Sequence, residues 1–314
     1  MDIHGLTVGK ERLDNNLFLA PMAGFTDYPF RKTIAPLGAG LSFTELTSAK
    51  GLYYGGKNNE ILLKADDKKR TAAQIFGSDP YFMRWACESE YLKDYGIVDI
   101  NMGCPVPKVV KNGDGSALLE NFSLAEEIIK ECVKSGKTIT VKIRTGIESG
   151  DDIAAEFCKM AENAGASLVT VHGRVRRAYY SGEPDLRAIA RAKRAVKIPV
   201  IANGGIFTVE DAERTLKETG ADGIMIARGA IADPFIFLKI AKKSAEGEIK
   251  TLKDFVLAHF AEERKTFGDG RAAVEFRKFL TYYFKSIENQ KQKRAEIMRS
   301  NAAEEIAELL GKYL

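Results

Sequence analysis

Eight short stretches rich in β-forming residues recur along the chain, and helical patterns separate most of them. The strand candidates are 17–22, 41–46, 71–77, 97–103, 138–144, 167–173, 199–205 and 223–229. The helical patterns are 80–94, 116–135, 151–164, 184–196 and 208–219, while 46–71 is interpreted as a loop with one short helix. This alternation predicts an α/β fold, which is either a (β/α)₈ TIM barrel or a doubly wound parallel sheet.

The ends of these strands favour the barrel. Each stretch closes with polar or glycine-rich residues where an apolar run would be expected. These residues are Pro21-Met22, Glu45, Gln74, 101–104, Lys142 and Arg144, 172–174, 203–205 and 227–229. A closed barrel brings all carboxyl strand ends to one mouth, where the active sites of this fold lie, whereas a doubly wound sheet scatters them.

The pattern changes to helices alone from about Thr251 onward. Helical segments are predicted at 252–267, 271–286 and 292–310, with Gly268-Asp269-Gly270 separating the first two. We therefore predict two domains, a barrel over 1–247 and a small all-helical domain over 248–314. Basic and aromatic residues interleave in the second domain, which indicates either a nucleic-acid surface or a solvated helix face over an aromatic core.

Charge balance and cysteine spacing indicate which partners, metal sites and cellular location to expect. The 47 Lys and Arg against 43 Asp and Glu permit a polyanionic partner without demanding one. The four cysteines contain no C-x-x-C pair, so neither a zinc site nor a disulfide framework is expected, and no metal is predicted. The chain shows no signal-peptide pattern and no long apolar run, so we expect a cytoplasmic protein without a membrane partner.

Cys104 is the first candidate for chemistry. It lies on a turn between Gly103 and Pro105, directly after a strand whose apolar and polar residues alternate. Asn101, three residues earlier, is placed to orient either the cysteine or a substrate. The alternative is that Cys104 is a small buried hydrophobic residue, as most free cysteines are.

Lys142 is the second candidate. In the stretch 138–144, Ile139, Val141 and Ile143 are expected to face the helices, so Lys142 and Arg144 face the barrel axis. A buried ammonium group requires an anion. That anion is either an internal carboxylate, with Asp99 as the obvious partner, or a cofactor that becomes anionic during turnover.

The loops after the seventh and eighth strands predict a phosphate site. Asn203-Gly204-Gly205 lets backbone N–H groups approach a phosphate, and Ala227-Arg228-Gly229 adds a guanidinium group, although glycines that serve only tight turns remain an alternative. Further round the mouth, Gln74, Lys142 and the lid Pro21-Met22-Ala23 fit the ring of FMN, and His172 would reach the ring or the phosphate or would be structural.

Nine motifs along the chain resemble those of the tRNA-dihydrouridine synthase family, with the bacterial B-type branch most similar. They are A-P-M-A-G-F-T-D at 20–27, A-Q-I-F-G at 73–77, D-I-N-M-G-C-P at 99–105, G-S-A-L-L at 115–119, V-K-I-R at 141–144, V-H-G-R at 171–174, Y-S-G at 180–182, A-N-G-G-I at 202–206 and I-A-R-G-A at 226–230. The resemblance implies a flavin barrel followed by a helical RNA-binding domain. It also implies NADPH as reductant and reduction of the C5=C6 bond of selected uridines in tRNA.

The resemblance also implies roles for individual residues. Cys104 matches the proton donor to C5 of the uridine. The FMN contacts would be Pro21, Met22, Ala23, Gln74, Lys142, His172, Asn203, Gly204, Gly205, Ala227 and Arg228. Two of these depart from the family pattern, since Gly205 stands where many members have an acidic residue and Ala227 where many have glycine. The expected substrate and tRNA contacts are Asn101, Lys108, Lys111, Arg144, Arg174, Arg176 and Arg177.

Two other functions are compatible with parts of this pattern. An FMN barrel acting on a free pyrimidine, of the dihydroorotate or dihydropyrimidine dehydrogenase type, would need neither the helical domain nor the arginines at 174–177. A tRNA-binding or flavin-binding protein without catalysis would not need both Cys104 and Lys142. A tRNA-dihydrouridine synthase, expected to be monomeric, is the predicted function.

Overall fold

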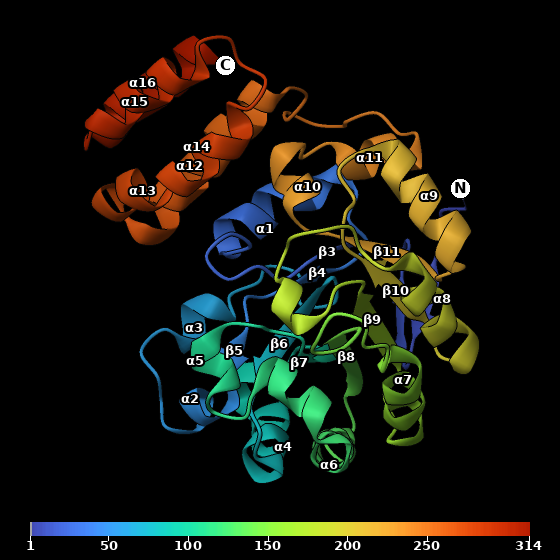
Figure 1. Cartoon of the computed structure of the whole chain (residues 1–314). Coiled ribbons are helices and arrows are strands. Elements are labelled where there is room, and N and C mark those ends of the chain that lie inside the picture. Colours follow the sequence, from blue (N-terminus) through green and yellow to red (C-terminus); the bar gives the residue numbers. More distant parts are fainter. Residues whose placement is uncertain (1) are drawn as a thin grey trace.

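The computed structural model describes residues 2–314, and its larger part is a parallel barrel (Figure 1). The barrel strands are β3 (Leu17–Leu19), β4 (Ser42–Phe43), β5 (Thr47–Ser48), β6 (Thr71–Phe76), β7 (Ile97–Met102), β8 (Thr138–Arg144), β9 (Leu168–His172), β10 (Val200–Asn203) and β11 (Gly223–Ile226). They are hydrogen-bonded in the order β3-β11-β10-β9-β8-β7-β6-β4, and β5 also pairs with β6. Of the second predicted strand, 41–46, only β4 forms, and β5 follows it as a separate short strand that was not predicted.

The barrel closes between its first two strands. A parallel bridge joins Phe18 to Leu41, and the Leu19 N–H donates to the Leu41 carbonyl at 2.9 Å. Sheet order and closure confirm the predicted (β/α)₈ barrel and exclude the doubly wound sheet. All carboxyl strand ends therefore meet at one mouth.

Helices surround the strands, as Figure 1 shows. They are α1 (Tyr28–Ile34), α2 (Ala49–Tyr53), α3 (Asn59–Leu62), α4 (Pro80–Glu88), α5 (Pro107–Val110), α6 (Phe122–Val133), α7 (Ala154–Asn163), α8 (Leu186–Ala195), α9 (Val209–Thr219), α10 (Arg228–Ala232) and α11 (Ile236–Ala241). Two short helices, α2 and α3, fill the segment 46–71, where we predicted one. The predicted helix 116–135 begins later, at Phe122, because the Asn121 side chain caps it by accepting from the Leu124 N–H.

A hairpin that the sequence did not predict lies at the floor of the barrel. It comprises β1 (Leu6–Val8) and β2 (Glu11–Leu13), and its residues Leu6, Val8 and Leu13 join the apolar cluster inside the barrel. This cluster includes Phe18 and Phe43. The interior is therefore apolar at the floor, and the polar interior residues gather toward the mouth.

The carboxyl-terminal region is all-helical, as predicted, but it has five helices where three were expected. They are α12 (Leu252–Phe267), α13 (Asp269–Glu275), α14 (Arg277–Tyr283), α15 (Gln290–Arg299) and α16 (Ala303–Tyr313). The expected segment 271–286 is divided at Phe276, and the segment 292–310 is interrupted at Ser300, whose backbone is extended. No helix within residues 2–314 has the length and apolar character that crossing a bilayer requires.

The helical region packs on α1 through aromatic rings. The Phe30 ring stacks on Phe279 at 5.8 Å and meets the edge of Phe255 at 6.0 Å, while Lys32 pairs with Glu262 at 3.0 Å. Barrel and helical residues belong to one continuous apolar cluster. The domain boundary at 247 stays a prediction.

Truncating Phe30 tests this packing. Because the ring is fully buried between the two regions, we expect Phe30→Ala to lower the free energy of unfolding by about 3–5 kcal/mol. Denaturant titration would measure the loss. Tyr54→Ala, at a ring that is 73% exposed, is the control and should change stability little. A similar small loss for both variants would contradict the packing described.

Candidate active site

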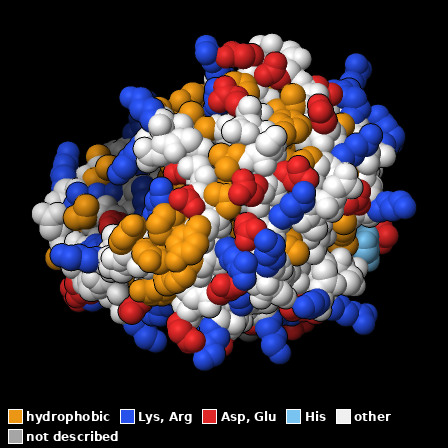
Figure 2. All heavy atoms as spheres, turned by 90° about the horizontal axis from the view of Figure 1, so that it is seen from below, with side chains coloured by type: hydrophobic (Ala, Val, Ile, Leu, Met, Phe, Trp, Pro, Cys, Tyr) orange, Lys and Arg blue, Asp and Glu red, His pale blue; other side chains and the backbone are white. Residues whose placement is uncertain are grey.

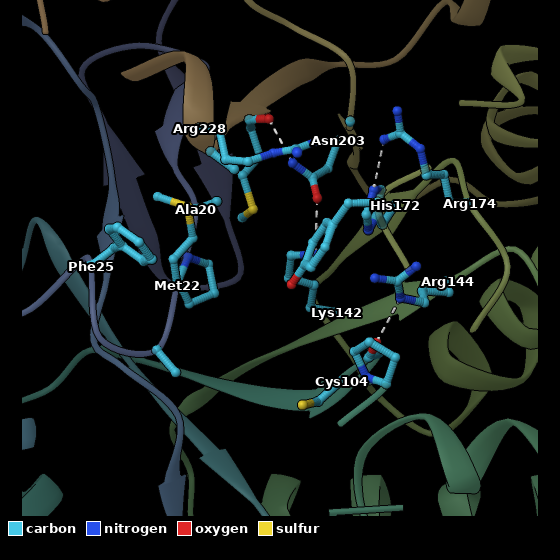
Figure 3. Close-up of a pocket in the computed structure, with 18 of the residues that line it drawn as sticks. Ala20, Met22, Phe25, Cys104, Lys142, Arg144, His172, Arg174, Asn203 and Arg228 are labelled. Atoms are coloured by element: carbon cyan, nitrogen blue, oxygen red, sulfur yellow. Dashed lines mark hydrogen bonds between the residues drawn. The ribbon is translucent and has the colours of Figure 1, made fainter. Parts of the chain in front are cut away.

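A large pocket opens at the mouth of the barrel, with a volume of about 620 Å³. That volume is within the range of cofactor and ligand sites. Figure 3 shows its residues converging from several strand ends. Of the predicted site residues, the pocket is lined by Pro21, Met22, Ala23, Asn101, Cys104, Lys142, Arg144, His172, Arg174, Asn203, Gly204, Gly205, Ala227 and Arg228.

The pocket carries positive charge without a matching carboxylate. Lys142, Arg144, Arg174 and Arg228 line it, and among the described residues no Asp or Glu does. Burial, followed by repulsion from these same four cations, lowers the pKa of His172 well below its usual 6.5. Because an unpaired buried cation is costly, this excess of charge indicates a site for an anion.

Lys142 meets an amide rather than a carboxylate. Its Nζ donates to Oδ1 of Asn203 at 3.0 Å, and the Asn203 Nδ2 donates to the Met225 carbonyl at 2.8 Å, which fixes the orientation of the amide. Burial is the main cause that lowers the pKa of Lys142 to about 8, with repulsion from Arg144 second. The ammonium group is thus poorly compensated by the protein.

The suggested ion pair between Lys142 and Asp99 is absent from the described residues. Both carboxylate oxygens of Asp99 accept other hydrogen bonds, from the Thr140 hydroxyl at 2.6 Å and from the Gln74 Nε2 at 2.7 Å. Burial raises the pKa of Asp99 to about 6. Of the two anions considered for Lys142, the internal carboxylate is therefore the one the structure does not support.

Gln74 lies beneath the pocket, not on its wall. The side chain is fully buried, and its Oε1 accepts from the Asn101 Nδ2 at 2.9 Å while its Nε2 is held by Asp99. The Asn101 Oδ1 in turn accepts from the Cys104 N–H at 2.9 Å. The predicted flavin contact of Gln74 remains a prediction, and in this structure the residue positions Asn101 and, through it, the Cys104 turn.

Cys104 faces the pocket, whereas Cys87, Cys132 and Cys158 are buried elsewhere. The Ser116 hydroxyl donates to the Cys104 carbonyl at 2.8 Å and holds the turn in place. Burial raises the pKa of the Cys104 thiol above its ordinary 9.0, although the Val106 N–H and two nearby cations oppose the shift. A thiol with this pKa is protonated at neutral pH and can donate a proton.

Two arginines fasten the segment 175–182 over the pocket. Arg144 donates from Nε to the Gly103 carbonyl at 2.9 Å and from Nη1 to the Val175 carbonyl at 3.0 Å. Arg174 donates from Nη2 to the Gly182 carbonyl at 2.6 Å and from Nη1 to His172 Nε2 at 3.3 Å. Since a guanidinium only donates, His172 accepts here as a neutral imidazole.

The glycines after β10 are required by the backbone. Gly204 and Gly205 have φ values of +117° and +71°, and a Cβ on Gly204 would lie 2.9 Å from the His172 ring. Arg228 lies beside them, 5.1 Å from the centre of the Tyr180 ring. Backbone close to the pocket, a guanidinium and the absence of a lining carboxylate among the described residues together fit a phosphate group.

Four predicted substrate contacts lie outside the pocket. Lys108 on α5 and the adjacent Lys111 are exposed. Arg176 pairs with Glu120 at 2.8 Å and Arg177 with Glu148 at 2.7 Å. Their roles stay predictions, and two of the four cations already have carboxylate partners.

Several pocket residues were not identified from the sequence. Tyr180 and Phe207, both partly exposed, flank Arg228, and Phe25 contacts Tyr282 of the helical region at 5.8 Å between ring centres. Tyr180 stands in the Y-S-G motif, which was the only available signal. No sequence signal marked Tyr282, because it reaches the barrel mouth only when α14 packs against the barrel.

A second group of aromatic rings was also missed. Tyr53 on α2 contacts Tyr81, Phe82 and Trp85 on α4, with centre-to-centre distances of 4.9–6.2 Å. Figure 2 shows an apolar patch on this side of the molecule, with both basic and acidic side chains around it. These rings do not line the pocket.

A family model matches nearly the whole chain. The family model described as "Dihydrouridine synthase (Dus)" matches residues 18–313. The chain belongs to the dihydrouridine synthase family. The expectation of a flavin-dependent oxidoreductase is thereby confirmed at the level of the family, and so is the resemblance stated from the motifs.

Curated relatives agree over nearly the whole length. "tRNA-dihydrouridine synthase B" of Pseudomonas aeruginosa is 35% identical over 300 residues, covering 93% of this chain and 90% of the relative. The protein of the same name from Vibrio parahaemolyticus is 35% identical over 316 residues, covering 98% of both chains. A "Probable tRNA-dihydrouridine synthase" of Rickettsia bellii is 33% identical, covering 94% of both.

Solved structures similar to this chain share its fold. A 2-naphthoyl-CoA reductase complex superposes with a TM-score of 0.60 at 12% identity, covering 76% of this chain and 51% of the other. Histamine dehydrogenase from Rhizobium sp. 4-9 gives 0.59 at 13% identity, covering 82% and 50%. At such identities the likeness concerns the barrel alone.

The raised pKa of Cys104 predicts how the thiol reacts. Only the thiolate is alkylated readily, so we expect iodoacetamide labelling of Cys104 to be slow at pH 7 and to rise with a midpoint above pH 9.0. Peptide mass spectrometry would follow each cysteine, with buried Cys158 as the internal control. A midpoint below about pH 8 would show a thiolate already present near neutrality.

Proposed function

We propose that this dihydrouridine synthase reduces the C5=C6 bond of specific uridines in tRNA, with FMN as the bound flavin and NADPH as the reductant. The observation that carries the proposal is the Cys104 thiol, whose pKa burial raises, facing a pocket lined by four cations and, among the described residues, by no carboxylate. Family membership supplies the reaction class. The choice of NADPH, a monomeric state and a cytoplasmic location stay predictions of the sequence analysis.

The residues present fit FMN. Arg228 and the backbone at 204–205 would hold its phosphate, Lys142 would face the part of the ring that gains negative charge, and 21–23 would cover it. The flavin, when bound, supplies the hydride that one carbon of the C5=C6 bond accepts. Lys142 suits this position because its ammonium gains little compensation from its Asn203 partner.

Cys104 would supply the proton. Its thiol donates to C5 of the uracil ring while the adjacent carbon receives the hydride, which completes the saturated bond. The Asn101 amide and the Ser116 hydroxyl hold the backbone of the Cys104 turn, so the Cα from which the thiol extends is fixed. Burial keeps the proton on sulfur until the base is in place.

The target base must leave its stack to reach this thiol. Cys104 lies in a pocket that a stacked base does not enter, and loop uridines are the least costly to extrude. Lys108 and Lys111, exposed on the segment that follows Cys104, are proposed to contact tRNA phosphates together with Arg176 and Arg177.

A bulk tRNA gel shift separates this function from a dehydrogenase of a free pyrimidine. We expect the protein to retard unfractionated tRNA, with an affinity that falls as salt rises because phosphates are contacted. Lys108→Ala combined with Lys111→Ala should reduce the salt slope by about 2. Absence of tRNA binding at low salt would favour the free-pyrimidine alternative.

Replacing the thiol tests the proton donor. Cys104→Ala should bind flavin and oxidise NADPH as before but form little dihydrouridine in unmodified tRNA, with a loss of roughly 10²- to 10⁴-fold. Cys158→Ala, which removes a thiol buried on α7, is the matched control. An unchanged dihydrouridine yield in Cys104→Ala would remove the acid role, and normal NADPH oxidation shows that the variant is folded.

Removing the Lys142 charge tests its proposed contact with the flavin. Since a charge-assisted hydrogen bond is worth about 1.5–3 kcal/mol, Lys142→Met should weaken retention of FMN or slow its reduction by roughly 10- to 100-fold. Anaerobic bleaching of the flavin absorbance by NADPH gives the rate. Wild-type retention and bleaching would count against this assignment.

A further inference from the structure

Two carboxylate side chains and one imidazole lie close together in the interior, between the barrel and the helical region. Asp27 caps the start of α1, and His259 and Glu263 lie one turn apart on α12. Their exposed fractions are 5%, 0% and 0%. Figure 1 shows α12 beside α1, which is where this cluster lies. The proposed reaction at the barrel mouth uses none of these residues.

Four polar atoms in the cluster have no hydrogen-bond partner within the described residues. They are Oδ2 of Asp27, Nε2 of His259 and both carboxylate oxygens of Glu263. One ligand atom from each residue lies within 4.8 Å of the other two, and the His259 Nε2 is 3.6 Å from the Glu263 Oε1. Buried polar atoms are nearly always paired, so four unpaired atoms converging on one point indicate a missing partner.

Neighbouring residues hold Asp27 and His259 in place but leave the atoms that face one another without hydrogen-bond partners. The Asp27 Oδ1 accepts from the Phe30 N–H at 3.0 Å, which leaves Oδ2 free. His259 Nδ1 lies 2.9 Å from the Tyr283 hydroxyl, so its other nitrogen points to the carboxylates. The Lys278 Nζ is 3.6 Å from Asp27 Oδ2, beyond hydrogen-bond distance, and its single positive charge faces the two carboxylates of Asp27 and Glu263.

We propose that Asp27, His259 and Glu263 bind a divalent transition-metal ion, best matched by Zn²⁺, which joins the helical region to the barrel. One imidazole and two carboxylates form a donor set that zinc accepts, while Mg²⁺ and Ca²⁺ prefer oxygen alone. Ligand distances of about 2.0–2.2 Å require the three donor atoms to move closer together than their present separations of up to 4.8 Å. The Tyr283 hydroxyl would then orient the imidazole from its far side, as partners of metal-bound histidines do.

This site is independent of the proposed reaction, and it differs from the sequence-based expectation that the chain binds no metal. That expectation rested on the absence of a C-x-x-C pair. Asp27 is far in sequence from His259 and Glu263, so no local motif marks the set. The alternative is a proton shared between the carboxyl groups of Asp27 and Glu263, with no ion present.

The test uses the full chain, stripped with a chelator and titrated with Zn²⁺ alone. We expect about one equivalent of zinc to bind per chain, a higher Tm on addition of zinc and a visible absorption band when Co²⁺ replaces it. Glu263→Gln and His259→Gln should lose the bound ion. Glu262→Gln, a neighbour on α12 that pairs with Lys32, should retain it.

Three outcomes would overturn the proposal. They are no zinc bound by the wild-type chain, an unchanged Tm on addition of zinc, or zinc retained by both cluster variants. The first two would favour the shared proton, and the third would place the ion elsewhere. If a variant does not fold, the Co²⁺ spectrum and the Tm of the wild-type chain still decide. None of these readouts depends on flavin or tRNA, so failure here would leave the proposed reaction untouched.

Discussion

The positive charge enclosed at the barrel mouth, with no carboxylate among the described lining residues, is the constraint on which the rest of the site depends. Burial, together with repulsion from Lys142, Arg144, Arg174 and Arg228, lowers the pKa of His172. A protein does not gather such charge in its interior without an anion to receive it. The phosphate of the proposed FMN would supply that anion, whereas the Asp99 carboxylate is bound by Thr140 and Gln74 and not by Lys142.

The same cations also build the walls of the pocket. Arg144 ties the Cys104 turn to the segment after β9 through backbone carbonyls, and Arg174 holds the far end of that segment. On the opposite side, the ring of Tyr282 reaches the mouth from the helical region and contacts Phe25. Loss of the helical region would therefore remove one wall of the pocket.

The alternation of apolar and polar residues along the strands determined how many of the pocket residues could be predicted from the sequence. Alternation in 138–144 placed Lys142 and Arg144 on the barrel axis, and the structure confirms that both line the pocket. The strands of the floor hairpin, β1 and β2, have three residues each, too few to show a period. Gln74 was predicted to be a pocket residue because it ends a strand, but alternation cannot tell a wall position from one beneath it. Tyr282 depends on docking between distant segments, which no local pattern records.

The central claim, that this pocket is built for a flavin with a phosphate, is tested most directly by comparing FMN with riboflavin. Titration of the flavin-free protein should give one FMN site per chain. Because two charge-assisted contacts contribute about 3 kcal/mol, FMN should bind roughly 100-fold more tightly than riboflavin. Equal affinity for the two flavins, or no binding of either, would contradict the account.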